Sequence, residues 1–272
     1  MTTGAPDYYK TALLAGMYGT APVLAYITSD GRFVMRLEDW PDIWGEAGAM
    51  GLAELAAIFS PAKRYDRRGQ VIYIDSFEAG LIMVDDEYSG TGAGIAVASD
   101  RARTGFHSCK LTAGSDGDCY SRIYHAIPYL STSRFGIEIS FTDHLDSEQH
   151  QLRGGINLRD GWYRFRLRYR RPEHDISYWD EDGNWQVIEE DVYLSDDNYM
   201  FHTAKLVFDA GSGDYVRWMV DNHTGSLAGV PGQYTVGLGY PAILFWFFVY
   251  STAGKNAVSY VDDLIITQNE PE

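Results

Sequence analysis

The run Ile243–Tyr250 is the most apolar stretch of the sequence, and it constrains the fold more than any other segment. It is bounded by Gly239, Pro241 and Gly254, and its eight residues are too few for a helix or a membrane span but suit a β-strand. Successive side chains of a strand point to opposite faces of the sheet. One face would carry Ile243, Phe245, Phe247 and Val249, and the other Leu244, Trp246, Phe248 and Tyr250.

Both faces of this predicted strand are apolar. In an antiparallel sandwich the outer face of a strand is normally polar, because it meets water. We therefore expect the second face to be covered, since a large exposed apolar patch promotes aggregation. The candidate covers are a short helix predicted at Gly51–Phe59, a loop that contains Trp40 and Trp44, and a neighbouring subunit.

Short strand-like segments separated by glycine-rich turns continue from Val71 to the end of the chain. Segment 135–142 alternates apolar and polar residues, 202–209 and 214–221 are strand-like segments around a glycine-rich turn, and 14% of all residues are aromatic. This pattern predicts an all-β protein, an antiparallel jelly-roll β-sandwich over residues 71–272. Residues 1–70 would form an N-terminal attachment section of short hairpins and one short helix, too small for a strong core of its own.

The net charge of −16 is concentrated in the predicted sandwich. Residues 1–70 hold seven of the 22 Lys and Arg and eight of the 38 Asp and Glu, so residues 71–272 carry almost all of the net charge. Such an acidic body repels the phosphates of nucleic acid, and we expect no nucleic-acid partner. No stretch reaches the roughly 18 apolar residues of a membrane helix, so we expect no membrane partner.

The N-terminus, Met-Thr-Thr-Gly-Ala-Pro-Asp, lacks the basic and apolar regions of a secretory signal. This predicts a protein that stays in the cytoplasm or leaves the cell inside a virion. The chain has two cysteines, Cys109 and Cys119, on either side of a turn-rich stretch. They could form a disulfide across a hairpin or remain two free thiols.

Four segments resemble strands of concanavalin A-like and carbohydrate-binding jelly rolls. Ile74–Gly80 resembles their opening strand, Ala102–Leu111 an inner strand, Phe201–Asp209 the inner strand of laminin G-like domains, and Ser259–Ile266 the closing strand. The resemblance covers residues 71–268 and implies the jelly-roll fold. It does not select a function, because this fold hosts hydrolases, lectins and virion parts.

A short front section on such a jelly roll also resembles structural proteins of tailed bacteriophages. This resemblance implies a virion location, with capsid or tail proteins as partners and self-association of the chain.

The jelly-roll resemblance implies a structural Ca²⁺ site where the first and last strands meet. The matching positions are Glu78, Asp262 and the backbone carbonyl of Lys110, and Asp75 is a further oxygen donor. Calcium prefers six to eight hard oxygen ligands. The alternative is that these acids only end strands at the surface.

A glycan-binding surface is predicted from the aromatic residues of the middle strands. Sugar rings present flat apolar faces that pack on aromatic rings beside polar groups. The candidates are Trp162, Tyr178, Trp179 and Trp185, with Tyr163 and Trp246 as further possibilities. The alternative is that most of these residues belong to the core.

Catalysis finds little support in the sequence. Hydrolases on this fold use a Glu-x-Asp-x-x-Glu strand to place two carboxylates in the cleft. Here Glu138 stands alone on its strand, and the sequence has neither an HExxH pattern nor a GxSxG elbow. We therefore predict a protein that is not an enzyme.

An arginine ladder occupies Arg164–Arg170, where every second residue is Arg. Phe165, Leu167 and Tyr169 would fill the core side of this strand. Acidic residues follow in the next segment, so we expect cross-strand ion pairs for the arginines, with contact to an acidic protein partner as the alternative.

The sequence favours a structural and interaction protein, docked through residues 1–70 in a larger assembly such as a phage particle. The expected assembly interface is Trp40, Trp44, Leu52, Leu55, Phe59, Trp246 and Phe248. The first alternative is a carbohydrate-binding module without catalysis, and a glycoside hydrolase comes third. Cell-surface or environmental glycans are the expected ligands of the first two classes.

Overall fold

The computed structural model describes residues 14–18, 21–27, 33–35, 68–129, 134–197, 199–237 and 239–272. The chain divides into two compact units, Met1–Leu52 and Ala53–Glu272. The first unit contains a three-stranded antiparallel sheet, whose strands are β1 Leu14–Tyr18, β2 Ala21–Ile27 and β3 Phe33–Met35. The helix predicted at Gly51–Phe59 and the loop with Trp40 and Trp44 lie outside the described residues.

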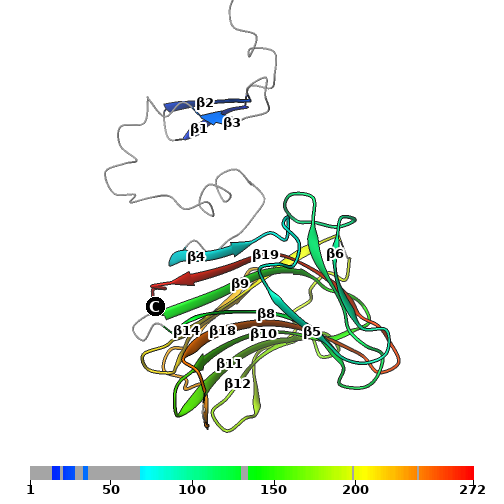
Figure 1. Cartoon of the computed structure of the whole chain (residues 1–272), viewed down its shortest axis with the longest axis vertical. Helices are drawn as coiled ribbons and strands as arrows, with labels where there is room; N and C mark the ends of the chain where they lie inside the picture. The colour runs from blue at the N-terminus through cyan, green and yellow to red at the C-terminus, as the bar shows by residue number, and fades with distance from the viewer. Residues whose placement is uncertain are drawn as a thin grey trace, which may run out of the picture. The chain divides into compact units, whose positions relative to one another are not determined.

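The second unit is built from two antiparallel sheets that lie in two layers (Figure 1). We call them the front sheet and the back sheet. In spatial order the front sheet contains β13 Trp185–Glu189, β12 Asp175–Trp179, β11 Gly161–Arg170, β10 Ser147–Asn157, β18 Ala242–Ser251, β8 Tyr120–Pro128 and β5 Asp85–Tyr88, with β17 Gln233–Val236 paired to β11. The back sheet contains β16 His223–Ser226, β15 Tyr215–Val220, β14 Phe201–Asp209, β9 Arg134–Thr142, β19 Val258–Gln268, β7 Ser108–Thr112 and β6 Gly94–Ala98, with β4 Gln70–Asp75 paired to β19.

This arrangement confirms the predicted all-β sandwich. The residues that the structure describes contain strands and turns and no helix, and every strand pairing among them is antiparallel. The first and last strands of the sandwich, β4 and β19, lie side by side, as expected for a jelly roll. Within the same residues no helix is long and apolar enough to cross a membrane.

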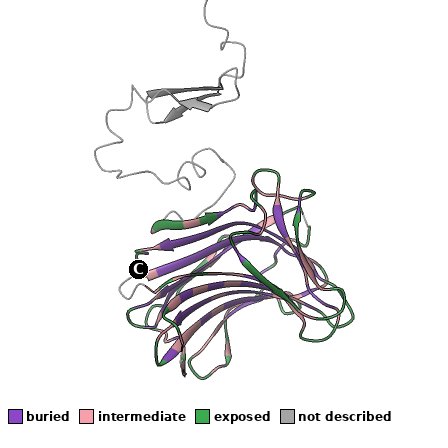
Figure 2. Cartoon of the chain, viewed as in Figure 1, coloured by how far each residue is buried: buried purple, intermediate pink, exposed green. Residues whose placement is uncertain are grey.

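Aromatic side chains of the two sheets share one core. Phe165 of β11 and Phe245 of β18 pack on Phe208 of β14, with ring centroids 4.6 and 6.1 Å apart. Phe141 of β9 meets Phe247 of β18 at 5.3 Å. Figure 2 shows the buried residues along the central strands of both layers. These contacts fix which side of each front-sheet strand faces inward, and therefore which side is left for a surface site.

The predicted apolar strand is β18, in the centre of the front sheet between β10 and β8. Ile243, Phe245, Phe247 and Val249 are all buried in the core, so of the two alternate sets this is the one that faces inward. The alternate set faces outward, and there only Phe248 is fully buried.

Candidate binding groove

Arginine and aromatic side chains form a row across the outer face of the front sheet. Directly paired residues of antiparallel strands point to the same face, so the pairing register identifies the members of this row. The successive pairs are Asp85 with Tyr124, Tyr124 with Trp246, Trp246 with Arg153, and Arg153 with Arg166. On the far side Trp179 pairs with Trp185, and the Arg166 guanidinium lies 4.4 Å from the Trp179 ring centroid.

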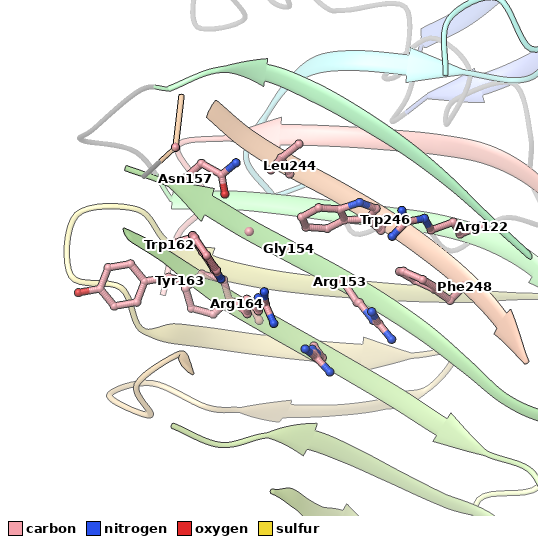
Figure 3. Close-up of a pocket in the computed structure, with 14 residues that line it drawn as sticks. Arg122, Arg153, Gly154, Asn157, Trp162, Tyr163, Arg164, Leu244, Trp246 and Phe248 are labelled. Atoms are coloured by element: carbon pink, nitrogen blue, oxygen red, sulfur yellow. The ribbon is translucent and has the colours of Figure 1, made fainter. Parts of the chain in front are cut away.

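The middle of this row is hollowed into a pocket of about 420 Å³. We call it the groove. Figure 3 shows aromatic and arginine side chains from β8, β10, β11 and β18 around it. Its lining side chains with polar or aromatic character are Arg122, Arg153, Asn157, Trp162, Tyr163, Arg164, Phe165, Arg166, Trp246 and Phe248. Among the described lining residues the only formally charged side chains are arginines.

Two glycines shape the ends of the groove. A Cβ on Gly155 would stand 2.8 Å from Cζ3 of Trp246, so the absence of a side chain lets the indole lie close to β10. A Cβ on Gly237 would stand 2.2 Å from Cζ3 of Trp162. Both tryptophan rings thus lie against backbone that carries no side chain.

Five guanidinium groups lie over aromatic rings of this face. Each lies within about 6 Å of a ring centroid, the range of a cation–π contact. The pairs are Arg153 over Phe248 at 3.7 Å, Arg168 over Trp185 at 4.0 Å, Arg166 over Trp179 at 4.4 Å, Arg122 over Phe248 at 5.2 Å and Arg164 over Trp162 at 5.3 Å. Among the described residues, no guanidinium lies over the Trp246 ring.

The prediction of ion pairs along the arginine ladder holds only for Arg170, which bonds Asp175 and Glu173. Arg164 and Arg166 have no carboxylate within ion-pair distance among the described residues, and Arg168 instead donates to the Ser177 hydroxyl at 3.3 Å. The prediction was wrong for these three, because the acids lie at the β11–β12 turn. Farther along β12, Ser177 and Trp179 face the ladder.

Arg153 is held in a fixed position within the groove. Its Nε donates to Gln151 Oε1 at 2.8 Å and its Nη2 donates to the Tyr250 hydroxyl at 2.7 Å. Burial, with the positive charges of Arg166 and Arg122 added, lowers the pKa of Arg153 to about 10. Burial and then Arg164 likewise lower the pKa of Arg166. Both groups remain charged at neutral pH, but in an environment that disfavours the charge.

Within the described residues, Arg122 is the one groove arginine with a carboxylate partner, since it bonds Glu87 of the edge strand β5. Nε of Arg122 and Nε of Arg168 are buried without an acceptor among the described residues.

Most of the aromatic residues predicted for glycan binding reach this face. Trp162, Trp179 and Trp185 lie there, together with Trp246. Tyr178 does not, because strand alternation turns it inward, where its ring packs against Tyr215 at 5.6 Å. The sequence reasoning missed Arg122 and Arg153, whose strands join the site only through the pairing of β8, β18 and β10.

The carboxylate considered for hydrolysis lies elsewhere. Glu138 is buried in β9 of the back sheet, 3.7 Å from Lys205 Nζ, and Lys205 also bonds Glu270 at 2.8 Å. This is a buried ion network within the sandwich, remote from the residues that line the groove.

The carboxylates proposed for calcium are hydrogen-bonded to backbone N–H groups. Glu78 accepts hydrogen bonds from the backbone of Phe106 and His107, and Asp262 accepts them from Arg103 and Thr104. Asp75 Oδ1 accepts the Phe77 N–H at 2.7 Å, and Lys110 lies in β7 beside β19. In the described part of the chain, no three acidic, histidine or cysteine side chains converge to hold an ion. Each of the three predicted carboxylates thus already accepts at least one backbone N–H.

Part of the predicted assembly interface cannot be placed. Trp40, Trp44, Leu52, Leu55 and Phe59 lie outside the described residues. Trp246 and Phe248, the other two members, line the groove. Both cysteines are free thiols, and Cys109 is buried in β7.

No protein-family model and no curated protein sequence matches this chain. Solved structures with a similar arrangement of strands include an endo-β-1,4-glucuronan lyase from the fungus Trichoderma reesei, at 13% identity over 73% of this chain and 95% of that chain, with a TM-score of 0.47. A Bacillus licheniformis β-glucanase matches at 10% identity over 73% of this chain and 98% of that chain, with a TM-score of 0.43. A xylan-binding domain from Paenibacillus barcinonensis matches at 13% identity over 76% of this chain and 100% of that chain, with a TM-score of 0.35. We draw no functional conclusion from likeness at this level.

Proposed function

We propose that the groove binds a glycan chain and that the protein acts as a binding module without catalysis. The observation that carries the proposal is the Trp246 ring, which lies against Gly155 in a surface pocket with no guanidinium over it among the described residues. An accessible indole beside hydrogen-bonding side chains is the arrangement that accepts the apolar face of a sugar ring. Asn157 and the arginines supply polar groups for the hydroxyls.

The composition of the groove favours binding over hydrolysis. Glycoside hydrolases of either stereochemistry use a pair of carboxyl groups beside the scissile bond. The described residues that line this groove include no Asp, Glu or His. A ligand held there would meet cationic and aromatic groups and no general acid.

As a second proposal, the chain docks through residues 1–70 in a larger assembly such as a phage particle. Its support is the first unit, in which the described residues form three short strands, too few for an independent core. The two proposals are compatible, because the groove lies on the front sheet of the second unit.

Trp246→Ala tests the proposed function. The full chain is first screened on a glycan array, and the affinity for the best ligand is then measured by titration calorimetry. We expect Trp246→Ala to weaken binding about tenfold, because one stacking partner of a sugar ring is lost. Tyr193→Ala removes a 69% exposed aromatic ring that does not line the groove, and it should leave the affinity unchanged. The proposal fails when no glycan binds, or when both variants bind as the unaltered protein does.

A further inference from the structure

The groove is a cationic strip on an acidic protein. The chain carries a net charge of −16, yet Arg122, Arg153, Arg164 and Arg166 all line this one pocket. Only Arg122 has a carboxylate partner among the described residues. In most of the described sandwich the arginines are paired, as Arg170 and Arg171 are with Asp175 and Asp143. Three arginines without a carboxylate partner among the described residues, Arg153, Arg164 and Arg166, therefore line the candidate site.

The groove arginines keep N–H groups available for a ligand. A guanidinium stacked on a ring uses its flat face and leaves the in-plane N–H groups along its edges for other partners. Arg166 over Trp179 and Arg164 over Trp162 have this arrangement and make no side-chain hydrogen bond among the described residues. Arg153 is fixed by Gln151 and Tyr250 through Nε and Nη2, which leaves its Nη1 donors. Paired N–H groups on a guanidinium edge match the two oxygens of an anionic group.

The unpaired charges also raise the energy of the empty groove. Arg153 and Arg166 are direct cross-strand partners, and like charges directly opposite each other are destabilising. An anion between them would relieve this repulsion and satisfy their donors together.

On the premise that the groove binds a glycan, we propose that its ligand is an acidic glycan, whose sugar units carry carboxylate or sulfate groups. Arg153, Arg164 and Arg166 hold the anionic groups by their guanidinium edges. Trp246 packs on a sugar face at the other side of the pocket. The shared chemistry is an oxyanion with two or more acceptor oxygens on a pyranose chain.

Single-stranded nucleic acid is also bound by arginine and aromatic side chains, but it fits this groove less well. Its successive bases need several free aromatic faces on which to stack. Here arginines lie over the rings of Phe248, Trp179 and Trp162, and Trp246 is the groove tryptophan without such a partner among the described residues. A sugar chain with anionic groups needs only one open ring and several guanidinium edges.

The test measures binding of the full chain to four probes: polygalacturonate, dextran sulfate, neutral dextran and a single-stranded oligodeoxynucleotide. We expect the chain to bind at least one acidic glycan, with an affinity that falls as salt is raised because ions screen the charges. Polygalacturonate and dextran sulfate distinguish a carboxylate ligand from a sulfate ligand. Neutral dextran should bind at least about tenfold more weakly, because hydrogen bonds to charged groups are lost.

Three arginine variants locate the effect. Arg166→Gln should weaken acidic-glycan binding about tenfold or more. Arg166→Lys keeps the positive charge but loses the paired N–H groups of the guanidinium, so its affinity should lie between those of Arg166→Gln and the unaltered protein. Arg159→Gln removes the same charge from an exposed turn residue and should bind as the unaltered protein does. Thermal melting checks that each variant is folded.

Each remaining outcome has a distinct meaning. Equal binding of neutral and acidic glycans, abolished by Trp246→Ala, would overturn the acidic ligand and leave the glycan groove standing. Tighter binding of the oligodeoxynucleotide than of either acidic glycan would overturn it as well. Absence of any glycan binding, on the array and with these probes, would remove the proposed function itself.

Discussion

The adjacent glycines of β10 offer a direct test of how the two faces of the front sheet differ. A Cβ on Gly154 would stand 2.2 Å from Cε1 of Phe208, which is fully buried. A Cβ on Gly155 would stand 2.8 Å from Cζ3 of Trp246, which is half-buried at the groove. The same substitution, glycine to alanine, therefore probes the core at one position and the groove at the next.

The expected magnitudes differ because the neighbours differ in their freedom to move. Overpacking a well-filled core costs about 1–3 kcal/mol, and Phe208 is stacked on Phe165 with centroids 4.6 Å apart, so Gly154→Ala should lose stability in this range. Gly155→Ala gains about 0.4–1 kcal/mol from the less flexible unfolded chain. The Trp246 ring can tilt outward, so its displacement should roughly offset that gain. Each kcal/mol corresponds to about 2–4 °C in Tm for a domain of this size.

Urea unfolding of the two variants and the unaltered protein measures these differences. We expect a lower unfolding midpoint for Gly154→Ala and a nearly unchanged one for Gly155→Ala. Glycan binding should show the opposite order, because only Gly155→Ala moves Trp246. Equal stability losses in both variants would refute the assignment of one face to the core and the other to the groove.

Two further predictions concern ionisable groups. Burial, followed by Asp263, raises the pKa of Asp262 to about 7, so the folded state holds this proton more tightly than the unfolded state does. The urea midpoint of unfolding should therefore fall as pH rises from about 4 to 7. The fall should be smaller in Asp263→Asn, because one neighbouring negative charge is removed. An equal fall of the midpoint in both proteins would contradict this. Burial also raises the pKa of the Cys109 thiol. A thiol reagent should therefore modify half-exposed Cys119 first and Cys109 only on unfolding. Equal rates of modification of the two cysteines in the folded protein would contradict this prediction.

Strand alternation predicts the two faces of each strand but not which strands become neighbours. Alternation assigned the inward residues of β11 correctly and divided β18 into the right two sets, of which the core takes the one with Phe245 and leaves Trp246 outside. Alternation within one strand, however, does not tell which strands become neighbours. Arg153 reaches the site only through the pairing of β10 with β11 and β18, and this register depends on contacts between distant parts of the chain.

The same limit explains the wrong role assigned to the arginine ladder. Acids follow the ladder closely in sequence, and nearness in sequence suggested ion pairs along the whole strand. A hairpin brings such acids only to its own end, so Arg170 meets Asp175 while Arg166 lies over Trp179. Distance from the turn, rather than the local count of acids, decides which arginines remain unpaired.

The outward face of β18 connects the predicted cover with the arginines of the groove. Its apolar side chains were expected to need a cover from another element or subunit. Within the described sandwich, part of the cover is supplied by arginine: Phe248 is only 2% exposed, with the Arg153 guanidinium 3.7 Å from its ring centroid. A long arginine side chain can shield an aromatic ring and still present charged donors at the surface. An aromatic outer face beside arginine strands can thus be protected from aggregation by the same groups that would hold an anionic ligand, without a protein partner.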